Sequence, residues 1–143
     1  MAILIDHIGI AVRDIQQAAR LYTEGLGLRL DYIEEVPSQG VRVGSLAVGE
    51  STIELLEPLG AEGPIADFLE KRGEGIHHIC LLVDDIRAAM AALQAQGARL
   101  LQEKPARGAG GSLIAFVHPR SANGVLLELC QRSEPPSTKG AET

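Results

Sequence analysis

The stretch GIHHICLLVDDI, residues 75–86, places two adjacent histidines at the start of an apolar run that ends in two aspartates. Residues 76–83 are predicted to form a buried β-strand, because the run is short, continuous and rich in β-branched residues. Asp85 then stands where a helix N-cap accepts a backbone N–H, and the apolar residues that follow recur at helical spacing. The stretch therefore predicts a strand that leads directly into a helix.

The same pattern occurs near the N-terminus. Residues 3–12, ILIDHIGIAV, form a second buried strand pattern that is followed by a capping aspartate and a helical pattern. An offset of 71 residues aligns His7 with His78 and Asp14 with Asp85. Self-similarity at a fixed offset indicates internal duplication of a supersecondary unit.

The two copies differ in length by three residues. The strand pattern IELL at residues 53–56 corresponds to LELC at residues 127–130, at an offset of 74. We expect the three extra residues of the second copy in the glycine-rich stretch at residues 108–111.

Each copy predicts the order β-α-β-β-β, so the fold class is expected to be α+β, with two tandem modules. The first module covers residues 1–60, a connector helix covers residues 61–74, the second module covers residues 75–132, and residues 133–143 form a polar, disordered tail. Strands are expected at residues 3–12, 28–35, 41–48 and 51–57, and at residues 76–83, 98–103, 112–118 and 124–131; helices follow Asp14 and Asp85.

Composition excludes several classes of protein. The 143 residues carry a formal net charge of -6, which argues against a nucleic-acid partner, since phosphate binding requires a concentrated basic face. The absence of a long apolar run or a signal pattern predicts a soluble, cytoplasmic protein without a membrane partner. Cys80 and Cys130 lack metal-binding or redox spacing and are interpreted as buried thiols.

The duplication pairs two histidines and two glutamates. His7 corresponds to His78 near the start of each first strand, and Glu54 corresponds to Glu128 among apolar neighbours in each last strand. A single strand histidine is more often a hydrogen-bonded core residue, and a single strand glutamate usually faces solvent. Four such positions under one repeat are better explained by a divalent metal site, and imidazole with carboxylate suits Zn, Co, Ni, Mn or Fe rather than Ca.

His77 aligns with Asp6 and not with a ligand position. Because neighbouring strand residues face opposite sides, His77 and His78 are not expected to point into one pocket. We therefore predict that His78 is the ligand and that His77 contacts the opposite face, the other module or another subunit.

The sequence resembles the vicinal oxygen chelate superfamily, and within it the methylmalonyl-CoA epimerase family. The resemblance spans residues 3–131 and is carried by IDHIGIAV, QGV, IELLEPLG, PIADFLEKRGEGIHHI, VDDI, GAGG and FVHPRSANGVLLEL. It implies a cupped mixed sheet around a divalent metal, with cobalt or zinc first and nickel or manganese as alternatives. It also implies an acyl-CoA substrate, a homodimer, and epimerisation of (2R)- and (2S)-methylmalonyl-CoA by C2 proton abstraction through a metal-stabilised enolate.

The resemblance also suggests roles for residues. Glu128 matches the family's metal-binding glutamate that acts as a base, whereas Val43 occupies the position where some relatives have a second glutamate. Glu54 is therefore assigned as the second base as well as a metal ligand. A plain turn or solvated surface charge is the alternative role for each residue assigned to substrate binding: Gly110, Gly111, His118, Lys104 and Arg107.

Three other functions remain open. A lactoylglutathione lyase (glyoxalase I)-type isomerase would use the same four-ligand arrangement but needs glutathione recognition. An Fe(II) ring-cleaving dioxygenase would use two histidines and one glutamate. A metal-free binding protein of the same superfamily would have no use for four buried polar groups.

Overall fold

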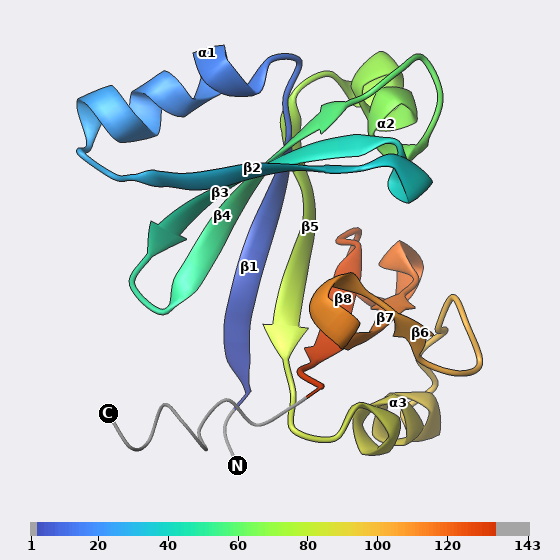
Figure 1. Cartoon of the computed structure of the whole chain (residues 1–143). Helices are drawn as coiled ribbons and strands as arrows, with labels where there is room; N and C mark the ends of the chain where they lie inside the picture. Colours follow the sequence, from blue (N-terminus) through green and yellow to red (C-terminus); the bar gives the residue numbers. More distant parts are fainter. Residues whose placement is uncertain (1–2, 134–143) are drawn as a thin grey trace, which may run out of the picture. The chain divides into compact units, whose positions relative to one another are not determined.

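The computed structural model describes residues 3–133, so most of the predicted tail, residues 134–143, lies outside the described residues. Contacts divide the chain into a first unit, residues 5–79, and a second unit, residues 80–143 together with residues 1–4. Figure 1 shows the helices and strands of the two units. Among the described helices, none is long and apolar enough to cross a membrane.

The first unit is a mixed sheet with two α-helices. Its strands lie in the order β2-β3-β4-β1, with β5 beside β1. The β2–β3 and β3–β4 pairs are antiparallel, whereas β1 and β4 are parallel. The elements are β1 (Leu4–Ala11), α1 (Ile15–Arg20), β2 (Leu30–Val36), β3 (Val41–Val48), β4 (Ser51–Pro58), α2 (Pro64–Arg72) and β5 (Gly75–Leu82), the last of which continues into the second unit.

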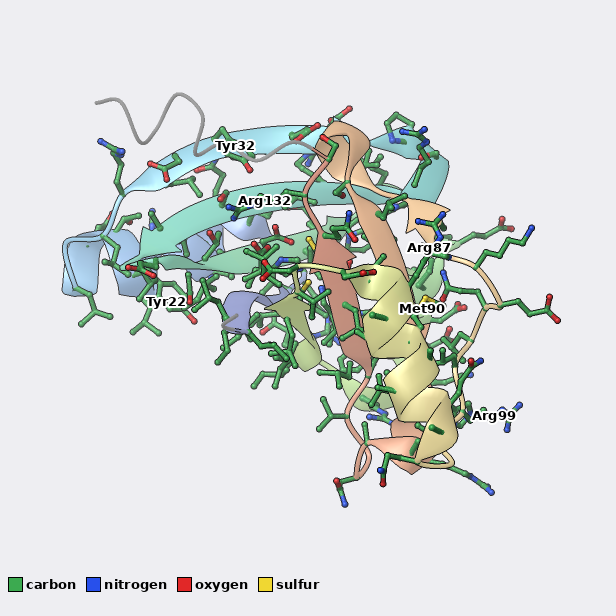
Figure 2. The ribbon with its side chains drawn as sticks, turned by 90° about the horizontal axis from the view of Figure 1, so that it is seen from below. Tyr22, Tyr32, Arg87, Met90, Arg99 and Arg132 are labelled. Carbon is green, nitrogen blue, oxygen red and sulfur yellow. The ribbon has the colours of Figure 1, made fainter. Side chains whose placement is uncertain are left out.

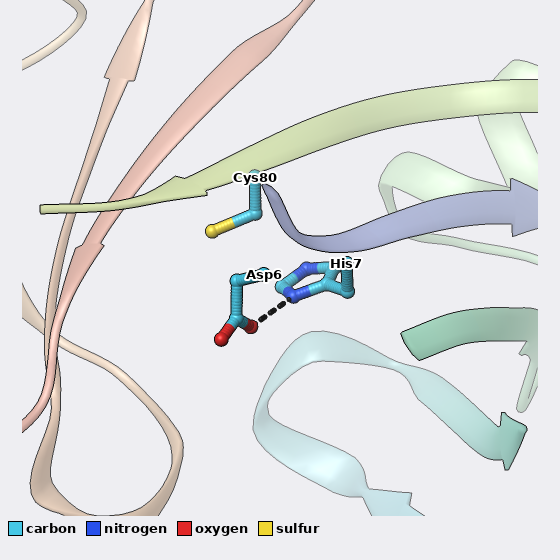
Figure 3. A group of neighbouring side chains, drawn as sticks. All are labelled: Asp6, His7 and Cys80. Carbon is cyan, nitrogen blue, oxygen red and sulfur yellow. Dashed lines mark hydrogen bonds and ion pairs between the residues drawn. The ribbon is translucent and has the colours of Figure 1, made fainter. Parts of the chain in front are cut away.

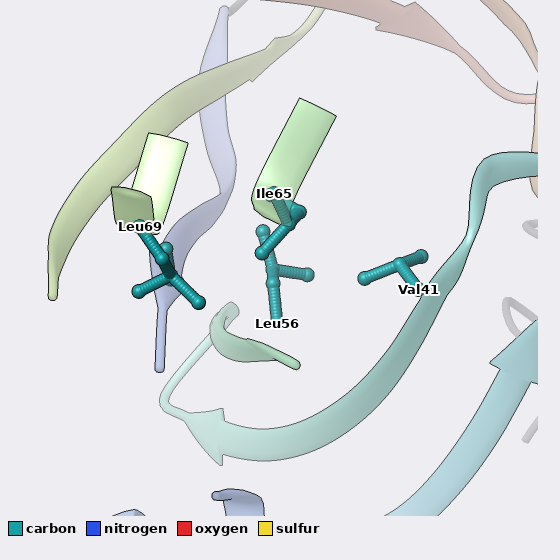
Figure 4. Close-up of a cluster of buried hydrophobic side chains, with 5 residues drawn as sticks. Val41, Leu56, Ile65 and Leu69 are labelled. Atoms are coloured by element: carbon teal, nitrogen blue, oxygen red, sulfur yellow. The ribbon is translucent and has the colours of Figure 1, made fainter. Parts of the chain in front are cut away.

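The two helices of the first unit cover opposite faces of its sheet. Leu56 of β4 points toward α2, while its neighbour Leu55 points toward α1, as the period of two along a strand requires. Burying each such side chain contributes about 1.5–3 kcal/mol. The α2 cluster contains Ala11, Val41, Leu56, Ile65 and Leu69 (Figure 4), and the α1 cluster contains Val12, Ile15, Ala19, Leu46 and Leu55.

The second unit repeats the motif around α3 (Ile86–Ala95). Its strands lie in the order β8-β7-β6, and both neighbouring pairs are antiparallel. These strands are β6 (Ala106–Arg107), β7 (Leu113–Val117) and β8 (Leu127–Gln131). Met90 of α3, labelled in Figure 2, packs into a cluster with Val83, Ile86, Ala115 and Leu129. The predicted α+β class with a mixed sheet is therefore confirmed.

Both predicted helix caps are present. The Asp14 carboxylate accepts a hydrogen bond from the backbone N–H of Gln17 at 3.1 Å, and Asp85 accepts from Ala88 at 3.0 Å. Each satisfies one of the N–H groups that a helix start leaves without an intrahelical partner. The two copies begin their helices in the same way.

A second contact fixes each helix start to the last strand of its module. The backbone N–H of Ile15 donates to Glu57 at 2.8 Å, and that of Ile86 donates to Gln131 at 2.8 Å. Glu57 also pairs with the Arg42 guanidinium at 2.7 Å. The pKa of Arg42 is raised by its hydrogen bond from the guanidinium to Glu35 and by the charge of Glu57, so this cation persists throughout the working pH range.

The strand predicted at residues 98–103 is wrong. Only Leu100 forms an isolated bridge, with Val117, and the edge strand is β6 further along the chain. The Leu101 N–H still donates to the Phe116 carbonyl at 2.9 Å, but beyond it the Gln102 side chain takes over, since its amide oxygen accepts from the Phe116 N–H at 3.0 Å. A side chain that satisfies a neighbouring strand is invisible to a hydrophobicity pattern.

The first predicted helix also differs at its end. The α-helix stops at Arg20 and continues as a π-helical turn over Leu21–Gly25. The Thr23 hydroxyl donates to the Ala19 carbonyl at 3.1 Å, which competes with the regular backbone pattern. The helical segment is therefore present at the expected place but wider in its last turn.

The extra residues of the second copy are not in the glycine-rich stretch. Ser45 pairs with Glu54 in the first unit, and Phe116 pairs with Glu128 in the second. The offset is therefore still 71 on β7, beyond the glycine-rich stretch, and becomes 74 only on β8. The prediction is wrong because composition alone marked the glycine run, whereas the insertion lies in the turn between β7 and β8.

Candidate metal centre

Two histidines of the first unit face each other with their ring tips. The Nε2 atoms of His7, on β1, and His78, on β5, lie 3.0 Å apart, and the rings meet edge to face with centroids 5.1 Å apart. Both residues are buried, at 9% exposure each. Two buried imidazoles that converge on one point are the arrangement expected of ligands to a cation.

Glu54 of β4 completes a group of three. Its Oε1 lies 3.5 Å from Nε2 of His7, and the donor atoms of His7, Glu54 and His78 all lie within 4.8 Å of one another. Two nitrogen ligands about 2.1 Å from one metal would be about 3.0 Å apart at an octahedral angle and about 3.4 Å apart at a tetrahedral angle. The separation of the two Nε2 atoms thus fits a shared divalent cation, and the donor set suits a transition metal.

Gly9 makes room for one of these rings. A Cβ built on Gly9 would clash with Cε1 of His78 and lie 2.7 Å from its Nδ1, although the Gly9 backbone is ordinary strand. Gly9 is also the register partner of Glu54. The glycine is therefore required for the space it leaves next to the site, not for its backbone conformation.

The other nitrogen of each ring is held by the preceding residue. Nδ1 of His7 lies 2.8 Å from Oδ2 of Asp6 (Figure 3), and Nδ1 of His78 lies 3.0 Å from Nδ1 of His77. The sequence predicts that only His78 faces the pocket and that His77 points to the opposite face, and it does not anticipate this contact between the two rings. Strand alternation separates the side-chain tips, but Nδ1 is close to the backbone and within reach of the adjacent residue. The alignment of His77 with Asp6 was the sequence signal for this role.

Sequence reasoning missed Ser45. It is 4% exposed and lies directly opposite Glu54 in the β3–β4 pair, so both side chains point to the same face. Val43, two residues earlier, packs against the apolar cluster beneath α2. The position that has a glutamate in some relatives thus belongs to the core here.

Glu128 lies in the second unit. It is 8% exposed on β8, and its register partner on β7 is Phe116. A carboxylate so buried requires a charged, hydrogen-bonding or metal partner. The corresponding glutamate of the first unit, Glu54, has a small serine in place of the phenylalanine and is only half-buried.

The residues predicted to contact substrate all lie in the second unit. Lys104 and Arg107 are exposed, and Lys104 lines a shallow groove along α3 with residues that include Arg87 and Met90 (Figure 2). Gly110 and Gly111 form a turn with φ of 65° and 79°, values that favour glycine. His118 accepts a hydrogen bond from the Arg120 N–H at 3.0 Å and so caps the turn that follows β7.

Comparison with known proteins defines the class. The sequence profile of the Glyoxalase/Bleomycin resistance protein/Dioxygenase superfamily matches residues 6–116. The chain is 44% identical to the ethylmalonyl-CoA/methylmalonyl-CoA epimerase of Cereibacter sphaeroides over 129 residues, which cover 89% of this chain and 96% of that protein.

Solved structures of methylmalonyl-CoA epimerases are similar to this chain. The crystal structure of methylmalonyl-CoA epimerase from Mycobacterium tuberculosis is similar with a TM-score of 0.83 and 40% identity, over 97% of this chain and 91% of that one. A methylmalonyl-CoA epimerase in complex with methylmalonyl-CoA and NH4+ is similar with a TM-score of 0.84 and 36% identity, over 93% and 96%. The chain therefore belongs to the methylmalonyl-CoA epimerase family of this superfamily and is an epimerase.

Proposed function

We propose that this epimerase interconverts the C2 epimers of methylmalonyl-CoA at a divalent metal held by His7, Glu54, His78 and Glu128. The observation that carries the proposal is the convergence of the His7 and His78 Nε2 atoms with Glu54 Oε1 in a chain so similar to epimerases of this substrate. Glu128 is included because the repeat makes it the counterpart of Glu54.

The metal would supply a Lewis acid for the thioester oxygen, where negative charge develops when C2 loses its proton. His7 and His78 contribute neutral imidazoles that leave the cation's charge intact. Cobalt or zinc fits this donor set best, with nickel or manganese as alternatives.

Inversion at C2 requires two acid/base groups. One carboxylate accepts the C2 proton from one face, and the other, in its protonated form, returns a proton to the opposite face. We assign these roles to Glu54 and Glu128, since Val43 lies in an apolar cluster and cannot take one of them. The first transfer breaks the C2–H bond and the second forms a new one on the opposite face, so the net reaction consumes neither protons nor cofactor.

The relatives support the proposed acyl-CoA specificity. The solved complex contains methylmalonyl-CoA, and the Cereibacter sphaeroides protein is named for ethylmalonyl-CoA as well. For the CoA phosphates we propose Lys104 and Arg107 together with the backbone of Gly110 and Gly111, and we propose that His118 shapes the adjoining turn.

The proposal is tested by following one methylmalonyl-CoA epimer in D2O with protein loaded with Co, Zn, Ni or Mn. Deuterium incorporation at C2 should accompany epimerisation. If no metal supports exchange, the proposed function is wrong. A parallel assay with a glutathione hemithioacetal tests the lactoylglutathione lyase alternative.

Glu54→Gln then tests the second base. A base that serves one face only should, when removed, abolish deuterium wash-in from one epimer and leave it from the other. Equal exchange from both epimers in the variant would remove Glu54 from this role.

A further inference from the structure

The two metal-ligating histidines are each preceded by a residue that holds their Nδ1 atom. Asp6 does so for His7 at 2.8 Å, and His77 does so for His78 at 3.0 Å. The two holding residues are equivalents under the 71-residue offset. The chemistry differs, because one acceptor is a carboxylate and the other is an imidazole.

The contact between His77 and His78 has a defined direction when a metal is bound. A neutral imidazole that ligates through Nε2 carries its proton on Nδ1, so His78 must donate from Nδ1. His77 must then accept at Nδ1 and carry its own proton on Nε2. Metal ligation and this contact together therefore select one tautomer of each ring.

The ring of His77 is itself held by the connector helix. Its centroid lies 5.2 Å from that of Phe68 in α2, with the rings edge to face at 75°. The Arg72 guanidinium lies 5.6 Å from the centroid of the same phenyl ring. Ile65 and Leu69 anchor α2 in the apolar cluster of the sheet. The chain of contacts thus runs from the core through Phe68 to His77.

We infer that His77, whose ring packs against Phe68, is a positioning residue that holds His78 in the tautomer and orientation needed to bind the metal through Nε2. The inference rests on the proposed metal site. An outer hydrogen-bond partner of this kind typically contributes a factor of about 10–100 in metal affinity. Helix α2 acquires a role beyond connecting the two modules, because it sets the position of a ligand without touching the metal.

The test separates the hydrogen bond from the ring packing. His77→Phe keeps an aromatic ring against Phe68 but removes the acceptor. His77→Asn removes the ring but places an amide oxygen at the position of Nδ1, since both atoms are bonded to Cγ. His77→Gln carries its amide one bond further and misplaces the acceptor, while the side chain remains polar.

The readouts are zinc affinity by competition with a chromophoric chelator, the visible absorption spectrum of the Co(II) protein, and the melting temperature of the metal-free protein. We expect His77→Phe and His77→Gln to weaken zinc binding about 10–100-fold and to change the cobalt bands. His77→Asn should bind within about threefold of wild type, because the acceptor is retained. The metal-free melting temperatures of the Asn and Gln variants should be equal.

Equal zinc affinity and equal cobalt spectra in wild type and His77→Gln would overturn the inference, and so would equal losses in His77→Asn and His77→Gln. None of these readouts depends on turnover. Wild-type protein that binds cobalt but does not epimerise methylmalonyl-CoA would therefore contradict the proposed function. The role of His77 in metal binding would still be decided by its variants.

Discussion

The two units use one framework and differ in what surrounds the proposed metal ligands. In both, an aspartate caps the helix, and a side chain of the last strand accepts a hydrogen bond from the first helical N–H. In both, a glutamate also lies three residues before that side chain on the last strand. The differences lie next to the ligands, where Asp6 corresponds to His77 and Ser45 to Phe116. Duplication has kept the positions of the proposed ligands and changed their neighbours, so the two halves of the proposed site are not identical.

The largest effect is expected from the glutamates. Glu54→Gln and Glu128→Gln should each lower kcat/KM for epimerisation by about 10²–10⁴-fold, because each removes an acid/base group. Glu57→Gln is the matched control, since Glu57 lies on β4 but faces α1. Steady-state kinetics on both epimers would measure the effect, and similar rates for Glu54→Gln and Glu57→Gln would contradict the assignment.

Gly9 offers the next test of the comparison, because its equivalent in the second unit is Cys80. Gly9→Ala should displace the His78 ring and lower activity by about 10²-fold, the cost of a misplacement of about 1 Å at a reacting centre. Zinc affinity should fall with it. Gly60→Ala is the control, since a Cβ there meets nothing within 4 Å. Normal zinc binding by Gly9→Ala would show that the sheet accommodates the methyl group.

Asp6 tests whether the charge of the holding residue matters. Asp6→Ala should weaken zinc binding about tenfold, because Nδ1 of His7 loses its acceptor. Asp6→Asn keeps a neutral acceptor, like the one that His77 provides on β5. Its loss of zinc affinity should be smaller than that of Asp6→Ala but measurable, since hydrogen bonds to an ionised group are about twice as strong as neutral ones. Chelator competition on both variants measures the difference. Identical affinities for Asp6→Asn and Asp6→Ala would contradict a role for the retained acceptor.

The smallest effect concerns what the units share. Asp14→Ala and Asp85→Ala should each lower the free energy of unfolding by about 1 kcal/mol through loss of a helix cap. That corresponds to a fall of about 3–4 °C in the melting temperature, which calorimetry can follow. Asp14→Asn and Asp85→Asn should be nearly neutral. A large difference between the two alanine variants would mean that the units contribute unequally to stability.

The duplicated framework was accessible from the sequence because its markers are local. The capping aspartates and the alternating strands each depend on residues within a few positions, and the 71-residue offset then linked His7 with His78. The features that the sequence did not predict share another cause. Gln102 bonds to β7 through its side chain, and His77 bonds to its neighbour through an atom that strand alternation does not separate. Both depend on the path of individual side chains, which no periodicity records.

The three extra residues between β7 and β8 have a consequence for how such proteins diverge. An odd number of residues added within a strand would invert every later side chain, and Glu128 would exchange places with Leu129. The same addition in a turn leaves the parity of β8 unchanged. Turns of this kind are therefore where length can vary freely, both in natural variants and when a peptide is inserted by design, while Glu128 keeps its side of the sheet.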